Sequence, residues 1–162
     1  LKAAVETDLR APWVIAAATI GFGVVLGVVD WRASRHRGLA QLGLRDALLI
    51  GLAQVLALIP GTSRSGITMT AALALGFDRA TASRFSFLLA IPTILASSVL
   101  VTHDLLRATE PVDWSSLAWG VVLSGIAAYT AIHLFLRFIE RIGMWPFVAY
   151  RLLLGAVILL FV

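Results

Sequence analysis

The sequence predicts an all-α integral membrane protein with four transmembrane helices and one re-entrant helical hairpin. Of its 162 residues, 60% are hydrophobic and only 14% are charged, and the mean hydropathy of +0.95 is far above that of soluble domains. Long apolar runs recur along the chain, and one of them is interrupted by a polar Pro-Gly segment. A chain of this length holds few crossings and little else, so we expect a single membrane domain over residues 1–162.

Four runs are long and apolar enough to cross a bilayer, and we expect each to be a helix because hydrocarbon offers no partner for an unpaired backbone group. They cover 13–29, 85–101, 117–136 and 144–162. Gly21, Gly23 and Gly27 recur along the first run, and small residues at such spacing let helices approach closely in lipid. We therefore expect this run to pack closely against a neighbouring helix.

The region 47–75 is apolar but does not fit a single crossing. Pro60 and Gly61 divide it into two arms, 47–59 and 67–75. The first arm forms about 20 Å of helix, which is too short for a hydrocarbon core of about 30 Å. We therefore expect a re-entrant hairpin over about 47–75, with its polar tip at membrane depth inside the protein or beside a wet cavity.

Charge placement is consistent with this topology. The segments 30–46, 79–84 and 137–141 are rich in arginine, whereas 103–113 contains three acids and one arginine. The positive-inside rule makes the first three cytoplasmic and the last external. This alternation requires 47–75 to cross an even number of times, either as a re-entrant hairpin or as two thin crossings. The arginines form no continuous stripe, so we expect no nucleic-acid partner.

The tip of the expected hairpin concentrates side chains that can bind an oxyanion. Its glycines allow close backbone approach, the start of the second arm offers unpaired N–H groups, and Arg64 can clamp two phosphate oxygens. An arginine at membrane depth costs at least a few kcal/mol, which favours a charged ligand there. The candidate residues are Gly61, Thr62, Ser63, Arg64, Ser65, Gly66 and Thr68, and Gln54 can point its amide toward the same cavity.

A simpler interpretation is that the hydroxyls merely cap the second arm while Arg64 bonds loose carbonyls. A cap needs one hydroxyl and no guanidinium, so anion binding is the favoured hypothesis. For Gln54, an interhelical hydrogen bond is an equally good hypothesis. Arg151, another charge inside an apolar run, is expected to reach the interface or form a structural pair rather than bind a ligand. All nine acids lie in linkers or at segment ends, so no metal site is predicted within this chain.

The segment 60–68 matches the Pro-Gly-x-Ser-Arg-Ser-x-x-Thr signature, and the chain resembles the undecaprenyl-diphosphatase (bacitracin-resistance) family. The resemblance extends through 51–54 and 82–93 and covers most of the chain. It implies a multi-pass enzyme of the bacterial inner membrane that hydrolyses undecaprenyl diphosphate to undecaprenyl phosphate and inorganic phosphate. Such hydrolysis recycles the lipid carrier for cell-wall synthesis. It also implies that this chain is the C-terminal half of an inverted-repeat bundle.

The family's catalytic positions fall on Ser63 and Arg64, with Thr68 supporting them. A divalent metal, Mg or Ca, and the acid/base residues are expected from the missing N-terminal half, so this chain alone is expected to be inactive. The expected partners are the polyprenyl diphosphate lipid, the N-terminal half and a second copy in a homodimer. Whether Ser63 attacks phosphorus or orients it stays open. A transporter or flippase for an anionic lipid is the alternative, because half-helices also hold anions in transporters.

Overall fold

The structure is a computed structural model that describes residues 11–107 and 113–161. In these ranges the chain forms six α-helices, and the one extended pairing is an isolated bridge between Arg37 and Phe77. The all-α class is therefore confirmed. The helices are α2 (Pro12–Arg32), α3 (Leu44–Ala53), α4 (Arg64–Ala74), α5 (Arg79–Leu106), α6 (Trp114–Ile142) and α7 (Trp145–Leu160), with short 3-10 turns at Leu39–Gln41 and Gln54–Leu58.

Three of the expected spans have the length and composition to cross a membrane, namely α2, α5 and α6. The fourth, α7, is apolar but has only 16 residues, or about 24 Å of helix. Residue 162, at the end of the expected run, and residues 108–112, within the expected external linker, lie outside the described residues.

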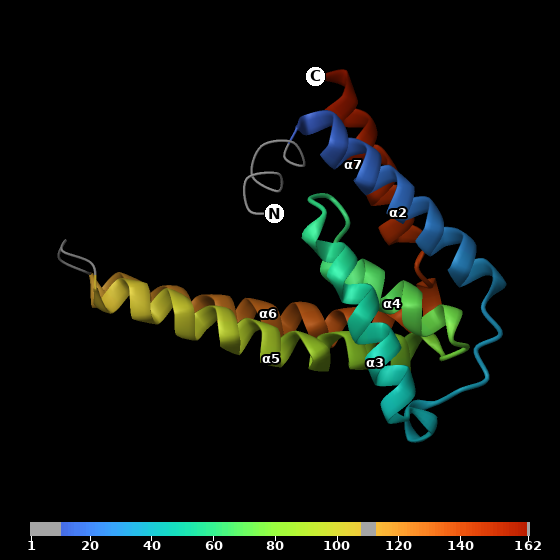
Figure 1. Cartoon of the computed structure of the whole chain (residues 1–162), viewed down its shortest axis with the longest axis horizontal. Helices are drawn as coiled ribbons and strands as arrows, with labels where there is room; N and C mark the ends of the chain where they lie inside the picture. The colour runs from blue at the N-terminus through green and yellow to red at the C-terminus, as the bar shows by residue number, and fades with distance from the viewer. Residues whose placement is uncertain (1–10, 108–112, 162) are drawn as a thin grey trace.

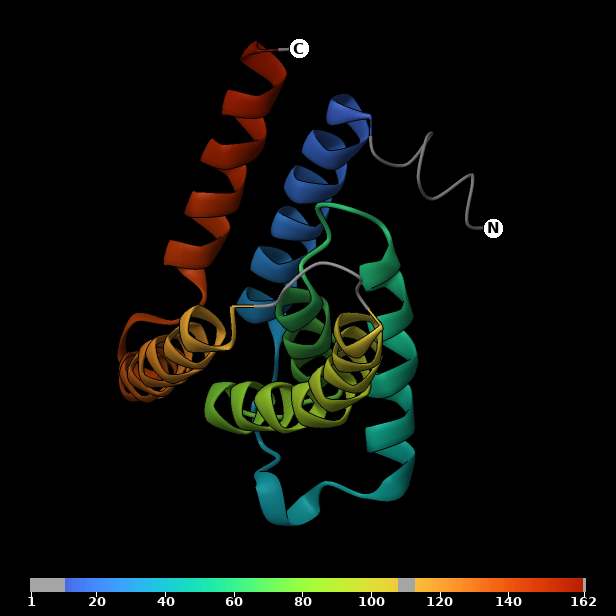
Figure 2. The same cartoon turned by 90° about the vertical axis from the view of Figure 1, so that its left-hand side faces the viewer.

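The helices form two long pairs with the short hairpin between them. Figure 1 shows α5 and α6 extending together away from the other helices, while α2 and α7 lie side by side at an angle to them. The helices α3 and α4 fold back on one another between these pairs, as both views show (Figures 1 and 2). The two arms predicted around Pro60 and Gly61 are thus helical and adjacent.

Close packing between α2 and α7 depends on glycine. A Cβ atom on Gly27 would lie 3.3 Å from Cγ1 of Val148, and one on Gly23 would lie 3.2 Å from Cβ of Arg151. Gly21, by contrast, has nothing within 4 Å of such an atom among the described residues. The expected close approach is confirmed for two of the three glycines, and α7 is the neighbour that needs the space.

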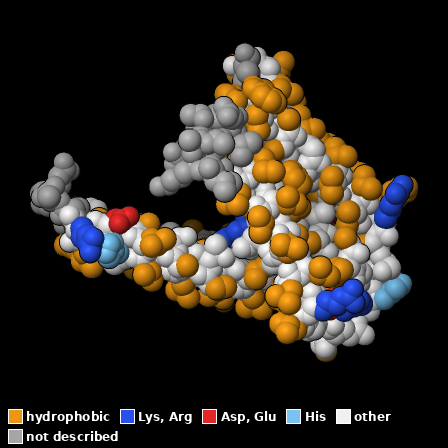
Figure 3. Space-filling model, in the orientation of Figure 1, with side chains coloured by type: hydrophobic (Ala, Val, Ile, Leu, Met, Phe, Trp, Pro, Cys, Tyr) orange, Lys and Arg blue, Asp and Glu red, His pale blue; other side chains and the backbone are white. Residues whose placement is uncertain are grey.

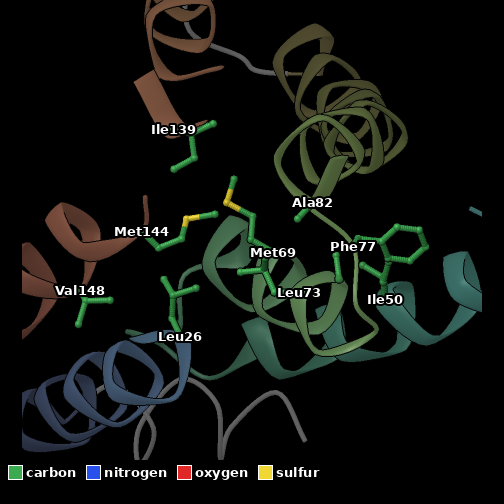
Figure 4. Packing of buried hydrophobic residues seen from close by; sticks show 10 residues of the cluster. Leu26, Ile50, Met69, Leu73, Phe77, Ala82, Ile139, Met144 and Val148 are labelled. Carbon is green, nitrogen blue, oxygen red and sulfur yellow. The ribbon is translucent and has the colours of Figure 1, made fainter. Parts of the chain in front are cut away.

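The core lies where α4 meets α2, α5 and the start of α7. Leu26, Met69, Leu73 and Met144 are buried there, and the same cluster continues to Phe77, which lies beside Ile50 of α3 (Figure 4). Outside this core, most apolar side chains face outward, and Figure 3 shows them spread over both long helix pairs while charged groups gather mainly at the ends. An apolar exterior of this kind suits a lipid environment.

An ion pair joins two of the arginine-rich segments, 30–46 and 79–84, at one end of the molecule. The carboxylate of Asp30 at the end of α2 is 1% exposed and accepts hydrogen bonds from Nε and Nη2 of Arg79, at 2.7 and 2.8 Å. Arg37 donates to both carboxylate oxygens of Asp46 and lies over the ring of Phe77. Its hydrogen bonds hold the pKa of Asp46 below the ordinary value. The linker before the hairpin and the turn after it therefore meet at the same end.

Candidate functional site

The tip of the α3–α4 hairpin turns tightly against α2. Gly61 has a φ of 91°, a conformation that glycine adopts at little cost. A Cβ atom here would lie 2.9 Å from the hydroxyl oxygen of Thr19 and closer still to the carbonyl oxygen of Ile15. The hydroxyl of Thr19 also donates to the Gly61 carbonyl at 3.3 Å. Glycine at this position thus lets the tip approach the backbone of α2.

Ser63 combines a strained backbone with a capping role. Its φ of 67° lies in the left-handed region, which a non-glycine residue adopts at a cost of about 1–3 kcal/mol. Its Oγ accepts a hydrogen bond from the Gly66 N–H at 3.2 Å and so caps α4. The capping hypothesis is therefore correct for Ser63. Strain of this kind is common in binding sites, where the surrounding structure holds the residue in place.

Arg151 reaches the tip from α7. Its side chain is 8% exposed, and it donates from Nη2 to the Gly61 carbonyl at 2.8 Å and from Nε to the Thr19 carbonyl at 3.3 Å. Of the two expectations for Arg151, the structural contact agrees with the structure and the interface position does not, because its guanidinium bonds backbone carbonyls inside the bundle. One side chain consequently joins α2, the hairpin tip and α7.

A cavity of about 590 Å³ opens beside the tip. The tip residues Gly61, Ser63, Ser65 and Gly66 line it together with three polar side chains from α2 and α7, those of Thr19, Tyr150 and Arg151. The remaining walls are mostly apolar and come from α2, α4, α5, α6 and α7, including Ile15, Phe87, Phe135, Phe147, Leu154 and Ile158. A mostly apolar cavity with a few convergent polar groups is the usual form of a small-molecule site. This one can accept a ligand with one polar end and one long apolar end.

Four of the predicted site residues do not line this cavity. Arg64 is the half-buried first residue of α4. The hydroxyl of Thr62 is buried and has no hydrogen-bond partner among the described residues. Thr68 lies inside the packing between α4 and α5, 2.7 Å from the hydroxyl of Ser86. Gln54 donates from Nε2 to Oγ1 of Thr93 at 3.3 Å, which is the interhelical hydrogen bond considered above.

The described residues provide no metal centre. Nowhere in 11–107 or 113–161 do three His, Asp or Glu side chains converge. Of the described residues that line the cavity, none is an acid or a histidine. The donors present therefore do not fit a divalent metal, and the expected Mg or Ca ion stays a prediction for the longer protein.

Comparison with known proteins places the chain among relatives that are longer than it is. The family model described as bacitracin resistance protein BacA matches residues 1–157. The protein named undecaprenyl-diphosphatase of Nitrosococcus oceani is 56% identical over 153 residues, which cover 94% of this chain and 58% of the relative. Undecaprenyl-diphosphatase 2 of Stutzerimonas stutzeri is 56% identical over 161 residues, covering 98% of this chain and 60% of the relative.

A third relative, the undecaprenyl-diphosphatase of Alteromonas mediterranea, is 56% identical over 162 residues, covering 100% of this chain and 61% of the relative. The chain thus spans about three-fifths of the length of these curated relatives. The family model covers nearly all of the chain, and the signature residues form the tip and first turn of one helical hairpin. The chain belongs to the bacitracin resistance protein BacA family.

Proposed function

We propose that the protein containing this chain hydrolyses undecaprenyl diphosphate to undecaprenyl phosphate and inorganic phosphate in the bacterial inner membrane. The observation that carries this proposal is the cavity that joins the hydrogen-bonding tip to apolar walls. A polyprenyl diphosphate has a charged diphosphate, which suits the tip, and a long apolar chain, which suits the walls. The names of the relatives support hydrolysis, and they do not favour the alternative of a transporter or flippase.

In the proposed membrane arrangement, α2, α5, α6 and α7 span the bilayer and the α3–α4 hairpin enters and leaves on one side. The shortness of α3 supports this arrangement, because its 10 residues give only about 15 Å of helix. The meeting of the linker and the turn at one end supports it as well, since both ends of a re-entrant hairpin must lie on one side. The remaining part of the protein completes an inverted-repeat bundle and supplies the metal ligands, and two copies form a homodimer.

The tip holds the diphosphate in this proposal. Helix α4 starts at Arg64, so its first N–H groups and the positive end of its dipole favour an anion beside Ser63 and Ser65. Arg64 does not line the cavity in this structure, but it directly follows Ser63 at the start of α4, and in the proposal its side chain turns toward the tip to clamp two phosphate oxygens and stabilise charge that develops during phosphoryl transfer. Gly61, Thr62, Gly66 and Thr68 shape the tip around the phosphates, and Gln54 holds the first arm against α5 through Thr93.

Ser63 orients the phosphate in this mechanism instead of attacking it. Its oxygen already accepts the Gly66 N–H, so its own proton is available to donate to a phosphate oxygen. The described residues that line the cavity include no acid or histidine, so an attacking role for Ser63 would need a base from the remaining part of the protein.

The test compares Arg64→Lys, Arg64→Ala and Ser65→Ala in the full-length protein. Lysine keeps the positive charge but lacks the planar guanidinium that can hold two oxygens, so we expect Arg64→Lys to lose nearly as much turnover as Arg64→Ala. Loss of one preorganised donor typically lowers turnover about a hundredfold to a thousandfold. Ser65→Ala should be milder than either.

The measurement is metal-dependent release of phosphate from a polyprenyl diphosphate in detergent, with each variant first shown to be folded. Near-wild-type turnover by Arg64→Lys would show that the bidentate clamp is wrong. A wild-type protein that releases no phosphate would overturn the proposed function itself.

A further inference from the structure

A buried hydroxyl pair joins α5 to the first turn of α4. The Oγ1 of Thr68 and the Oγ of Ser86 lie 2.7 Å apart, and the two residues are 1% and 3% exposed. Thr68 Oγ1 also lies 3.0 Å from the carbonyl oxygen of Arg64 and 3.1 Å from that of Ser65. Ser86 Oγ is 3.5 Å from the Ser65 carbonyl. These contacts form one connected network beneath the signature residues.

The direction of these hydrogen bonds follows from the number of protons. Each hydroxyl has one proton, and the two carbonyls can only accept. The Thr68 proton has two carbonyl acceptors within hydrogen-bond distance, those of Arg64 at 3.0 Å and Ser65 at 3.1 Å, whereas the Ser86 proton has no comparable acceptor other than Thr68. Ser86 therefore donates to Thr68 at 2.7 Å, since its contact with the Ser65 carbonyl is at the limit of hydrogen bonding. A hydroxyl that accepts one hydrogen bond donates more strongly in the next, so the successive hydrogen bonds from Ser86 and Thr68 strengthen one another.

The planar peptide between Ser65 and Gly66 connects this hydrogen-bond network to the cavity. The carbonyl of Ser65 and the N–H of Gly66 belong to the same rigid peptide plane, so holding the carbonyl fixes the direction of the N–H. That N–H donates to Ser63 Oγ at 3.2 Å, and Ser63 lines the cavity. A continuous path therefore runs from Ser86 through Thr68 and the Ser65–Gly66 peptide to the Ser63 hydroxyl.

We propose that Ser86 is a positioning residue that sets the orientation of the Ser63 hydroxyl and of the first peptide planes of α4. The expected effect on catalysis rests on the proposed function. The role of Ser86 in orienting the Ser63 hydroxyl does not depend on it. Ser86 itself does not line the cavity, and its short hydrogen bond goes to Thr68.

The chain offers a matched control on the same helix. Ser83 lies one turn before Ser86 on α5, is 0% exposed, and has its hydroxyl 4.0 Å from the sulfur of Met69. Ser83→Ala removes the same atom from the same kind of buried site without touching the network at the tip. Any general effect of replacing a buried serine in α5 should appear in both variants.

The kinetic arm of the experiment measures phosphate release by the full-length protein. We expect Ser86→Ala to lower kcat about threefold to tenfold relative to Ser83→Ala, the range for one neutral hydrogen bond, with little change in KM. Thr68→Val, which keeps the side-chain shape, should lower kcat as well, whereas Thr68→Ser should restore it. Because both residues act in one path, the double variant Ser86→Ala/Thr68→Val should be no worse than Thr68→Val alone.

The second arm measures amide hydrogen exchange in peptides that cover 63–68 and requires no activity. Ser86→Ala should speed exchange there, while Ser83→Ala should leave it at the wild-type rate. Equal exchange and equal kcat in the two serine variants, or effects of Ser86→Ala and Thr68→Val that multiply, would overturn the inference. If the wild-type protein released no phosphate, the proposed function would fail while the exchange arm still decided the role of Ser86.

Discussion

Arg151 is the side chain that ties the hairpin tip to the rest of the bundle. Its two hydrogen bonds end on carbonyls of α2 and of the tip, Thr19 and Gly61. Hydrogen bonds from a charged donor are worth about 1.5–3 kcal/mol each, so this contact is a large part of what holds the tip in place. Gly23 of α2 leaves the space that the Arg151 side chain occupies.

We expect Arg151→Lys to lower turnover roughly tenfold or more, since lysine donates from a single nitrogen and cannot bridge two carbonyls in this geometry. Phosphate release by the full-length protein and its thermal unfolding in detergent are the measurements. Arg141→Lys is the control, because Arg141 is exposed at the end of α6 and does not line the cavity. Wild-type values for both variants would show that the bridge does not matter.

Comparison of the two arginines shows what the sequence can and cannot predict at this scale. The cost of a charge inside an apolar run draws attention to Arg64 and Arg151 alike. The signature favours Arg64, yet it is Arg151 that lines the cavity. Its partner Gly61 is 90 residues away along the chain, and no spacing rule connects residues so far apart. The signature identified the polar residues of the tip, whereas the contact that positions the tip could not be predicted from it.

The hairpin is the element whose form was best predicted. Pro60 and Gly61 mark its tip correctly, and both arms are short helices. The boundaries of the long helices were less accurate, because the apolar run beginning at 85 omits the polar first turns of α5. That helix starts at Arg79, where Asp78 accepts the Thr81 N–H at 2.6 Å and supplies a cap. Hydropathy detects only the part of a helix that lies in lipid. A capped polar segment, such as the start of α5, continues the helix outside that part.

Cysteine labelling can test the proposed path of this hairpin, because the chain has no native cysteine. We expect His36→Cys, before the hairpin, and Ala80→Cys, after it, to react with impermeant reagents from the same, cytoplasmic side. Ser115→Cys, at the start of α6, should react from the opposite side. Labelling of positions 36 and 80 from opposite sides would show that 47–75 crosses an odd number of times and rule out re-entry.

On the scale of the whole molecule, the most exposed part is the pair α5 and α6. The most apolar stretch of α6 has 0% of its residues buried, and that of α5 has 11%. Figure 3 shows hydrophobic side chains along this pair. Such a surface requires cover by lipid tails, by the rest of the protein or by a second copy. Sequence composition predicted the apolar exterior, but it contains no information on which of these three covers each face.

We expect the isolated 162-residue chain to release no phosphate from a polyprenyl diphosphate in the presence of Mg or Ca. The reason is that the described residues bring no cluster of acids or histidines together, and a metal bound to a diphosphate usually needs carboxylate ligands. The full-length protein, purified in the same detergent, is the positive control. Metal-dependent turnover by the isolated chain would show that the site is complete without further residues.

The carbonyl of Gly61 couples the hairpin tip to the positions of two helices. It accepts hydrogen bonds from Thr19 on α2 and from Arg151 on α7, so a single oxygen atom is shared by two helices that lie far apart in sequence. Any change in the tilt of α7 against α2 must stretch one of these bonds or displace the turn that precedes Ser63. The thickness of the surrounding bilayer, which influences helix tilt, is thereby linked to the geometry of the proposed phosphate-binding tip.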